Sequence, residues 1–162
     1  MMQRRELFSS LASSFAKKEQ GSHIIRPPYF LKEEDFEICK SCDGACQNTC
    51  KEDIITILED GSPKLDFSKG GCTYCDECAK ACKHEVLKVE YKKEINAKIT
   101  IDVLKCISWQ KTICFSCKDV CLDNAINYLG LFRPEIDEDI CTNCGFCVGV
   151  CPTNAIKVEK WQ

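Results

Sequence analysis

The chain has 162 residues, 29% of them charged, and a formal net charge of −3 at pH 7. The slight excess of negative charge argues against non-specific nucleic-acid binding, and no apolar stretch is long enough to cross a membrane as a helix. Sixteen residues are cysteine, and the other apolar residues are few for a core of this size, so we expect the cysteines to organise the interior.

The first segment, 1–19, predicts a short amphipathic helix. One face of this helix carries its apolar residues, namely Leu7, Phe8, Leu11 and Phe15. These residues either pack on the rest of the chain or dock on a partner, and the Gly, Ser and Pro residues of 20–30 indicate a linker that favours docking. Neither a continuous apolar segment nor a small-residue cleavage site follows Arg4 and Arg5, so we expect a cytoplasmic protein with reduced thiols.

The cysteines follow in four groups of four, with none left over. The groups are Cys39, Cys42, Cys46 and Cys50; Cys72, Cys75, Cys78 and Cys82; Cys106, Cys114, Cys117 and Cys121; and Cys141, Cys144, Cys147 and Cys151. The second and fourth groups have the CxxCxxCxxxC spacing of bacterial ferredoxins. A loop with this spacing wraps three corners of one cubane. We expect the fourth cysteine to begin a short helix and to bind the neighbouring cluster.

The first and third groups depart from this spacing. The first has one extra residue before its third cysteine, and the third has seven residues between Cys106 and Cys114. Zinc favours two CxxC pairs that lie further apart, and a disulfide scaffold requires a secreted chain. The sixteen cysteines are therefore expected to be the ligands of four [4Fe-4S] clusters. Consecutive pairing of the groups, one with two and three with four, is the simplest arrangement, and a nested pairing, one with four and two with three, stays open.

The segments between the groups repeat one order of elements. After the first group, the segments 54–58 and 63–67 flank Asp60 and Gly61, which predicts two strands joined by a tight turn. Matching segments are 86–89 and 99–102, then 125–128 and 134–137, with 155–158 as a closing strand. We predict an α+β fold of tandem bacterial-ferredoxin-like repeats, with a first module over 31–92 and a second over 93–162.

The seven-residue stretch between the first two cysteines of the third group contains Trp109, for which two roles are open. Its indole either shields the third cluster from water or contacts a partner, because tryptophan is enriched at interface anchors. The sequence contains no phosphate-binding glycine loop, nucleophile elbow or flavin fingerprint, so we expect an electron-transfer or assembly protein and no enzyme.

The groups and spacers resemble bacterial-type ferredoxin repeats, and the chain resembles the NapF family of ferredoxin-type accessory proteins of periplasmic nitrate reductase systems. The family resemblance rests on the sequence RRELF at 4–8, on 60–67 leading into Cys72, and on the stretched third group with Trp109 and Gln110. The chain departs from the ferredoxin pattern after three fourth cysteines, where Lys51, Lys83 and Leu122 replace the usual proline. This departure affects the local start of a helix more than cluster binding, because proline is not a ligand.

The resemblance implies a function as well as a fold. It implies an accessory protein that binds the cytoplasmic precursor of the molybdenum-containing nitrate reductase catalytic subunit and assists its maturation before export. The alternative is a polyferredoxin that carries electrons or serves as the electron-transfer subunit of a redox complex.

Overall fold

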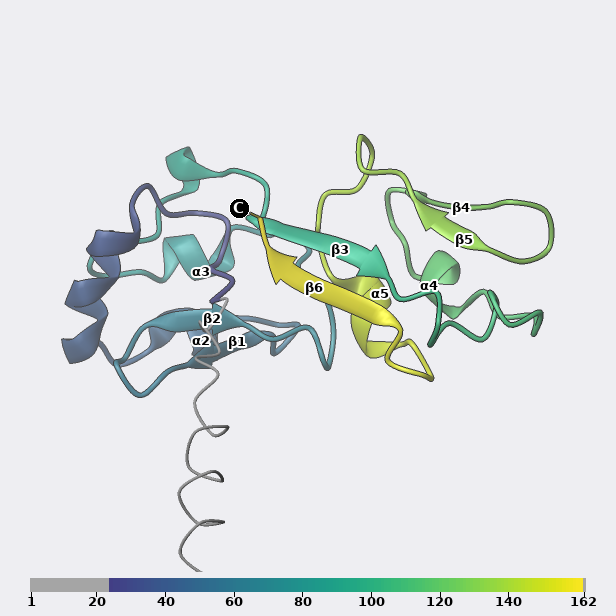
Figure 1. The fold of residues 1–162 in the computed structure, drawn as a ribbon. Coiled ribbons are helices and arrows are strands. Elements are labelled where there is room, and N and C mark those ends of the chain that lie inside the picture. The colour runs from purple at the N-terminus through teal and green to yellow at the C-terminus, as the bar shows by residue number, and fades with distance from the viewer. Residues whose placement is uncertain (1–23, 162) are drawn as a thin grey trace, which may run out of the picture.

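The computed structural model describes residues 24–161, which form two lobes joined by a pair of strands (Figure 1). The first lobe contains the 3₁₀ helices η1 (Glu33–Ser41) and η2 (Val89–Tyr91), the helices α2 (Ala45–Asn48) and α3 (Glu77–Lys80), and the strands β1 (Ile55–Ile57) and β2 (Pro63–Leu65). The second contains α4 (Ser116–Asp119), α5 (Phe146–Gly149), β4 (Ile126–Tyr128) and β5 (Pro134–Ile136). The strands β3 (Ala97–Ile101) and β6 (Ile156–Lys160) run between the lobes. The chain thus mixes short helices and short strands, as predicted.

Two of the predicted strand pairs form between consecutive cysteine groups. The strands β1 and β2 pair antiparallel with Ile55 opposite Leu65, and β4 and β5 pair in the same way with Ile126 opposite Ile136. The four side chains at these positions carry the apolar pattern of the spacers, and three of them are buried. The apolar residues at corresponding places in the first and third spacers therefore predicted both hairpins.

The second spacer does not form a hairpin. Its strand β3 pairs antiparallel with β6, so that Ala97 faces Lys160 and Ile101 faces Ile156. The segment 86–89, predicted as a strand, lies beside the buried segment 25–30, and the Lys88 N–H donates to the Tyr29 carbonyl at 2.8 Å. A longer ladder cannot form there, because Pro27 and Pro28 have no N–H group to donate.

Residues 25–30, at the end of the predicted linker, are buried in the first lobe. The Leu65 N–H of β2 donates to the Ile25 carbonyl at 2.7 Å, and the Tyr29 side chain is 1% exposed. This segment lies along β2 and closes the core of the first lobe, where a linker would run over the surface. The predicted helix 1–19, with Leu7, Phe8, Leu11 and Phe15, lies outside the described residues.

One local turn recurs after all four cysteine groups. The third cysteine of each group lies in a short helix and the fourth follows the end of that helix, which corrects the expectation that the fourth cysteine begins it. Three residues after each fourth cysteine, a residue with positive φ donates its N–H to the carbonyl of that cysteine; the donors are Asp53, Glu85, Asn124 and Asn154. The turn is the same whether proline, lysine or leucine follows the cysteine, so the missing prolines do not alter it.

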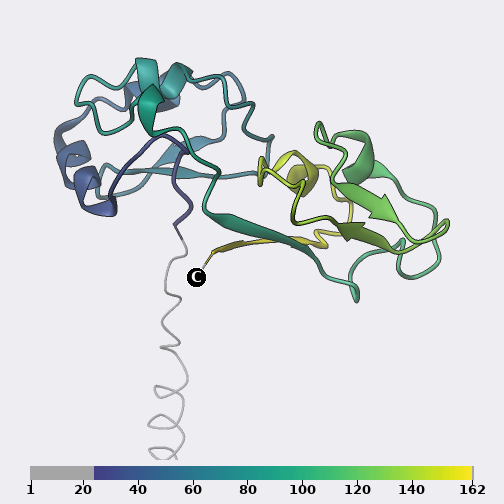
Figure 2. The ribbon, with the colours of Figure 1, turned by 90° about the horizontal axis from the view of Figure 1, so that it is seen from above.

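The view from above shows the β3–β6 pair running between the two lobes (Figure 2), and the lobes also share side-chain packing. Val148 and Val158 pack against the hydrophobic cores of both lobes. Glycines allow close approach between the loops, because a Cβ at Gly71 would overlap Phe146 and a Cβ at Gly145 would overlap the ring of Phe67. No helix within 24–161 is both long enough and apolar enough to cross a membrane.

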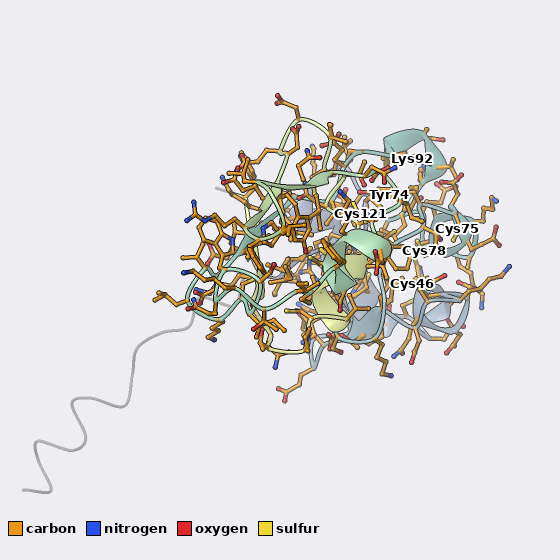
Figure 3. All side chains as sticks on the ribbon, turned by 90° about the vertical axis from the view of Figure 1, so that its right-hand side faces the viewer. Cys46, Tyr74, Cys75, Cys78, Lys92 and Cys121 are labelled. Carbon is orange, nitrogen blue, oxygen red and sulfur yellow. The ribbon has the colours of Figure 1, made fainter. Side chains whose placement is uncertain are left out.

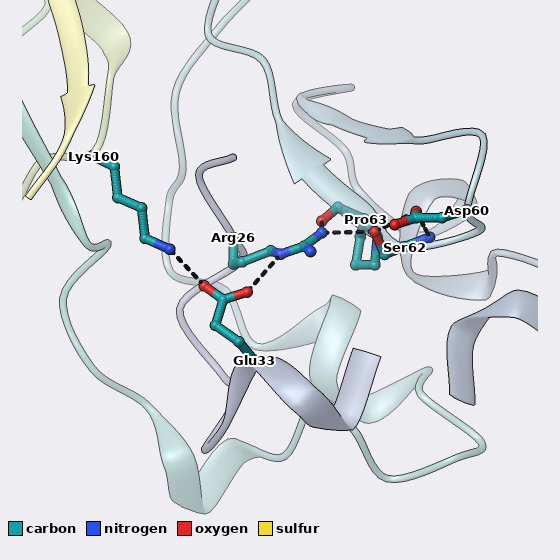
Figure 4. Close-up of polar contacts among 6 residues, drawn as sticks. All are labelled: Arg26, Glu33, Asp60, Ser62, Pro63 and Lys160. Carbon is teal, nitrogen blue, oxygen red and sulfur yellow. Dashed lines mark hydrogen bonds and ion pairs between the residues drawn. The ribbon is translucent and has the colours of Figure 1, made fainter. Parts of the chain in front are cut away.

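A polar network joins the beginning and the end of the described chain (Figure 4). The buried Arg26 guanidinium donates to Glu33 at 3.1 Å, to the Ser62 hydroxyl at 2.8 Å and to the Pro63 carbonyl at 2.7 Å. From the end of β6, Lys160 donates to the same Glu33 carboxylate at 2.9 Å. Burial pushes the pKa of Glu33 upward, but hydrogen bonds from Lys160 and Arg26 outweigh it and hold that pKa below its usual value.

Candidate metal centres

All sixteen cysteines lie within the described residues, and none of them forms a disulfide. The third cysteine of each group is buried in its short helix, whereas most of the others are partly exposed. Twelve of the sixteen thiols line three described cavities, one in the first lobe and two in the second.

The first cavity lies in the first lobe and is lined by Cys50, Cys72, Cys75 and Cys78. Cys75 and Cys78 are labelled close together in Figure 3. Three of these thiols belong to the second group, and the other, Cys50, is the fourth cysteine of the first group. The fourth cysteine of group one thus joins the first three cysteines of group two.

The second lobe contains two cavities of the same construction. One is lined by Cys106, Cys114, Cys117 and Cys151, so the fourth cysteine of group four joins the first three of group three. The other is lined by Cys121, Cys141, Cys144 and Cys147, so the fourth cysteine of group three joins the first three of group four. Groups three and four thus each contribute their fourth cysteine to the cavity of the other group.

The thiols of Cys39 and Cys46, in the first group, lie near Cys82, the fourth cysteine of the second group. Burial, and after it the thiols of Cys82, Cys39 and Cys42, raises the pKa of Cys46 to about 11. The pKa of Cys39 is likewise raised to about 11 by burial and by the nearby thiols of Cys42 and Cys82. The structure therefore brings the groups together consecutively, one with two and three with four, which is the simpler of the two arrangements left open by the sequence.

Three of the four fourth cysteines, each of which lies with the neighbouring group, accept backbone hydrogen bonds at sulfur. The N–H groups of Leu87, Ala125 and Ala155 donate to the Sγ atoms of Cys82, Cys121 and Cys151 at 3.4, 3.3 and 3.2 Å. Burial alone would raise the pKa of Cys151, but the N–H groups of Ala155 and Thr153 outweigh it and hold this pKa below its usual value. The donors to Cys151 therefore favour its thiolate, which is the form that binds metal.

Two buried thiols, those of Cys78 and Cys147, show the opposite shift in pKa. Burial, reinforced by neighbouring thiols, raises the pKa of Cys78 and that of Cys147 to about 12. Such thiols stay protonated near neutral pH, so a metal bound at these cavities would displace protons and supply the positive charge that the thiolates need.

The donor set of each cavity fits a cubane iron-sulfur cluster. Four thiols surround each of the three cavities, and iron in [4Fe-4S] clusters is held by four cysteine thiolates. Within residues 24–161, no three His, Cys, Asp or Glu side chains converge as the ligands of a single metal ion do. Ligands of a cubane stand further apart, because each thiolate binds a different iron corner.

The loops of groups two and four touch each other across the two lobes. The Cys72 N–H donates to the Cys144 carbonyl at 2.7 Å, and the Tyr74 hydroxyl donates to the Thr142 carbonyl at 2.5 Å. Lys92, labelled beside Tyr74 in Figure 3, donates to the Tyr74 carbonyl at 3.2 Å. The cavities of groups two and four are thus held next to each other.

Trp109 does not line the cavity around Cys106. Its indole N–H donates to the Pro134 carbonyl of β5 at 3.1 Å, and the Arg133 guanidinium lies 5.7 Å from the ring centroid. The adjacent residues Ile107 and Ser108 line the cavity instead. Sequence reasoning did not identify Ser108, and its position inside the stretched group was the only signal for it.

Comparison with known proteins points in the same direction. A family model described as "4Fe-4S binding domain" matches residues 134–157, which contain the fourth cysteine group. The chain is 31% identical over 145 residues to the ferredoxin-type protein NapF of Escherichia coli (strain K12), covering 86% of this chain and 87% of that protein. It is 33% identical over 160 residues to NapF of Haemophilus influenzae, covering 96% and 90%. The ferredoxin-type protein NapG of Escherichia coli (strain K12) is 29% identical over 161 residues, covering 83% and 69%.

Proposed function

Since the chain belongs to the NapF family of ferredoxin-type proteins, as its sequence predicted, we propose that it is an iron-sulfur accessory protein with four [4Fe-4S] clusters. We propose further that it works in the cytoplasm, where it assists maturation of the precursor of the periplasmic nitrate reductase catalytic subunit before export. The observation that carries the cluster assignment is the gathering of four thiols, three from one group and one from its neighbour, around each of these three cavities.

Each proposed cluster takes three cysteines of one group and the fourth cysteine of the neighbouring group. The four sets are Cys39, Cys42, Cys46 with Cys82; Cys72, Cys75, Cys78 with Cys50; Cys106, Cys114, Cys117 with Cys151; and Cys141, Cys144, Cys147 with Cys121. Groups one and two would form one ferredoxin-like module, from 31 to 92 with the buried segment 25–30 added, and groups three and four a second module over 93–162. A bound cluster supplies one-electron chemistry.

The surface supports a protein partner. Most of the large apolar side chains that are exposed lie in or beside the second lobe, namely Val103, Leu104, Ile113, Phe115, Leu122, Leu129, Leu131, Ile140, Val150 and Trp161. Leu104 is 84% exposed and Leu122 68%. Exposed apolar side chains in such number favour contact with another protein. We propose that this lobe, together with the N-terminal residues Leu7, Phe8, Leu11 and Phe15, contacts the precursor.

The electron carrier remains the second candidate, because one observation favours it. The hydrogen bond from Cys72 to Cys144 holds the cavities of groups two and four next to each other across the lobes. Cys72 lines the cavity of the first lobe and Cys144 lines a cavity of the second, so the backbone joins the two proposed cluster sites directly. The two candidates differ in the form of the nitrate reductase that the protein binds best.

Binding measurements with the precursor and with the mature, exported enzyme separate the two candidates. We expect the wild-type protein to bind the precursor more tightly, because an assembly factor must release its finished client. Changing Leu7, Phe8, Leu11 and Phe15 to serine should remove this affinity and leave iron content unchanged, since none of these residues is a cysteine ligand.

The matched control changes Leu31 and Ile38 to serine, because both are exposed apolar residues of the first lobe. This control should bind the precursor as the wild type does. An electron carrier would instead prefer the mature enzyme. Equal binding of both forms by the wild type and by the four-serine variant would contradict the docking proposal.

A further inference from the structure

The cavity around Cys106, Cys114, Cys117 and Cys151 is rich in hydroxyl groups. Besides the four thiols, Ser108, Ser116, Tyr128 and Thr153 line it. The Ser116 hydroxyl lies 3.6 Å from Cys114 Sγ, and the Thr153 hydroxyl lies 3.8 Å from Cys151 Sγ. By contrast, the lining of the cavity around Cys121, Cys141, Cys144 and Cys147 contains no Ser, Thr or Tyr among the described residues.

Three of these four hydroxyls have a protein partner, and that of Ser108 has none. Tyr128 donates to the Cys114 carbonyl, and Ser116 and Thr153 contact the ligand thiols. The Ser108 side chain is 1% exposed, and its Oγ is a buried polar atom without any hydrogen-bond partner in the described structure. Buried hydroxyls are nearly always hydrogen-bonded, so an unpaired one that lines a cofactor cavity indicates a partner in that cavity.

The backbone holds Ser108 firmly at this place. Its carbonyl accepts from the Lys111 N–H at 3.1 Å, and the Ile107 carbonyl accepts from the Thr112 N–H at 3.0 Å. The adjacent Trp109 is anchored to β5 through its bond to the Pro134 carbonyl. The seven residues between Cys106 and Cys114 therefore form a tight turn that places Ser108 in the lining of the cavity.

We propose that the Ser108 hydroxyl donates a hydrogen bond to a sulfur atom of the cluster held by Cys106, Cys114, Cys117 and Cys151, and so raises the reduction potential of that cluster. This inference rests on the cluster assignment proposed above. Reduction places more negative charge on the sulfurs, so a donor to sulfur stabilises the reduced state more than the oxidised state. Ser108 is then a positioning and tuning residue, and not a ligand.

The structure offers a matched control for this hydroxyl. Thr56 Oγ1 in β1 is the other buried side-chain oxygen or nitrogen that lacks a partner among the described residues. Thr56 is not among the residues that line the three cavities. Removal of its hydroxyl therefore tests the effect of deleting a buried unpaired group at a distance from the proposed cluster.

The experiment is a redox titration of the full chain, reconstituted under anaerobic conditions and followed by electron paramagnetic resonance. We expect Ser108→Ala to shift the midpoint potential of one cluster to a more negative value and to leave the others unchanged. Ser108→Thr keeps the hydroxyl and should keep the potential, whereas Ser108→Val has the size of threonine without the hydroxyl and should show the negative shift. Thr56→Val should shift none of the potentials.

Iron and acid-labile sulfide are measured in every sample, so that the two proposals fail in different ways. A wild type without labile sulfide would contradict the cluster assignment itself. If the Ser108 variants hold as much iron and sulfide as the wild type and all potentials stay unchanged, the tuning role of Ser108 is wrong. It is also wrong if Ser108→Thr and Ser108→Val shift a potential equally, because their shared size and not the hydroxyl would then be responsible.

Discussion

Among single residues, the fourth cysteine of each group determines how the groups depend on one another. Cys151 follows α5 and lines a cavity with three cysteines of group three, while its sulfur accepts the Ala155 N–H at 3.2 Å. Cys121 makes the reciprocal crossing and accepts the Ala125 N–H at 3.3 Å. A substitution at either residue should therefore act on the neighbouring group and not on its own.

Cys151→Ser provides the sharpest test of this crossing. We expect it to alter the paramagnetic signal of the cluster held by Cys106, Cys114 and Cys117, because serine replaces one of its four thiolates. The matched variant Cys121→Ser should instead alter the signal of the cluster held by group four. The measurement is electron paramagnetic resonance of each reduced variant. A change confined to the cluster of the first group in Cys151→Ser would contradict the crossing.

The spacing of the cysteines predicted most of what the structure shows at this scale, because ligand spacing is a local property of the chain. It indicated four groups and an exchange of the fourth cysteine, but left open which groups pair. Ser108 could not be identified, since its burial depends on the turn of the stretched third group and on the anchoring of Trp109 to β5. Neither contact has a signature in the sequence.

Among the elements, close packing between loops of the two lobes depends on glycine. Gly145 has a φ of +86°, and a Cβ on it would overlap the ring of Phe67 in the first lobe. Gly130, in the turn between β4 and β5, has a similar φ of +72° but no atom within 4 Å of a Cβ built on it. The two glycines therefore share the backbone requirement and differ in the space around them.

Gly145→Ala should lower stability more than Gly130→Ala. Both variants incur backbone strain, since non-glycine residues rarely adopt positive φ. Only the first also forces a clash in a packed contact, which adds roughly 1–3 kcal/mol. The measurement is the guanidinium concentration at which the cluster absorbance of the reconstituted protein is lost. Equal midpoints for the two variants would show that the contact with Phe67 contributes nothing.

The hairpins β1–β2 and β4–β5 were predictable, because each has two apolar strands close together in the sequence. The partner of β3 was not predictable, because β6 is far from it in the sequence. The apolar pattern of β3 does not specify which strand pairs with it. The absence of a strand over 86–89 follows from Pro27 and Pro28 in the neighbouring segment. The Pro, Gly and Ser residues of 20–30 suggested a linker, although the same segment contains Tyr29 and Phe30, whose side chains are buried in the structure.

On the scale of the whole molecule, the two ends of the described chain meet at Glu33. Arg26 binds Glu33 from the first lobe, and Lys160 binds it from the last strand. The Arg26 side chain is 9% exposed, while those of Lys160 and Glu33 are 34% and 41% exposed. The buried arginine should therefore contribute far more to stability than the outer lysine does.

Arg26→Ala should destabilise the protein by several times more than Lys160→Ala. Removing one partner of a buried charged network costs about 3 kcal/mol or more, whereas exposed ion pairs contribute about 1 kcal/mol or less. The Arg26→Ala substitution also leaves the Ser62 hydroxyl and the Pro63 carbonyl without the guanidinium donor. Denaturation midpoints of the two variants measure the difference. A loss for Lys160→Ala that equals the loss for Arg26→Ala would contradict this ranking.

Removal of iron should unfold most of the chain. Many of its interior positions are cysteines, and the apolar residues that remain make a thin core, so metal binding and folding are coupled. We expect the chelated protein to lose most of its far-ultraviolet circular dichroism and to show no cooperative thermal transition. A cooperative transition in metal-free protein would contradict this coupling.

The content of iron and acid-labile sulfide per chain tests the central proposal most directly. If the crossed sets of cysteines hold four clusters, the protein reconstituted under anaerobic conditions contains roughly sixteen iron and sixteen sulfide per chain. Its brown colour is bleached by dithionite, because the clusters accept electrons. Stoichiometric zinc without labile sulfide in the same preparation would contradict the account.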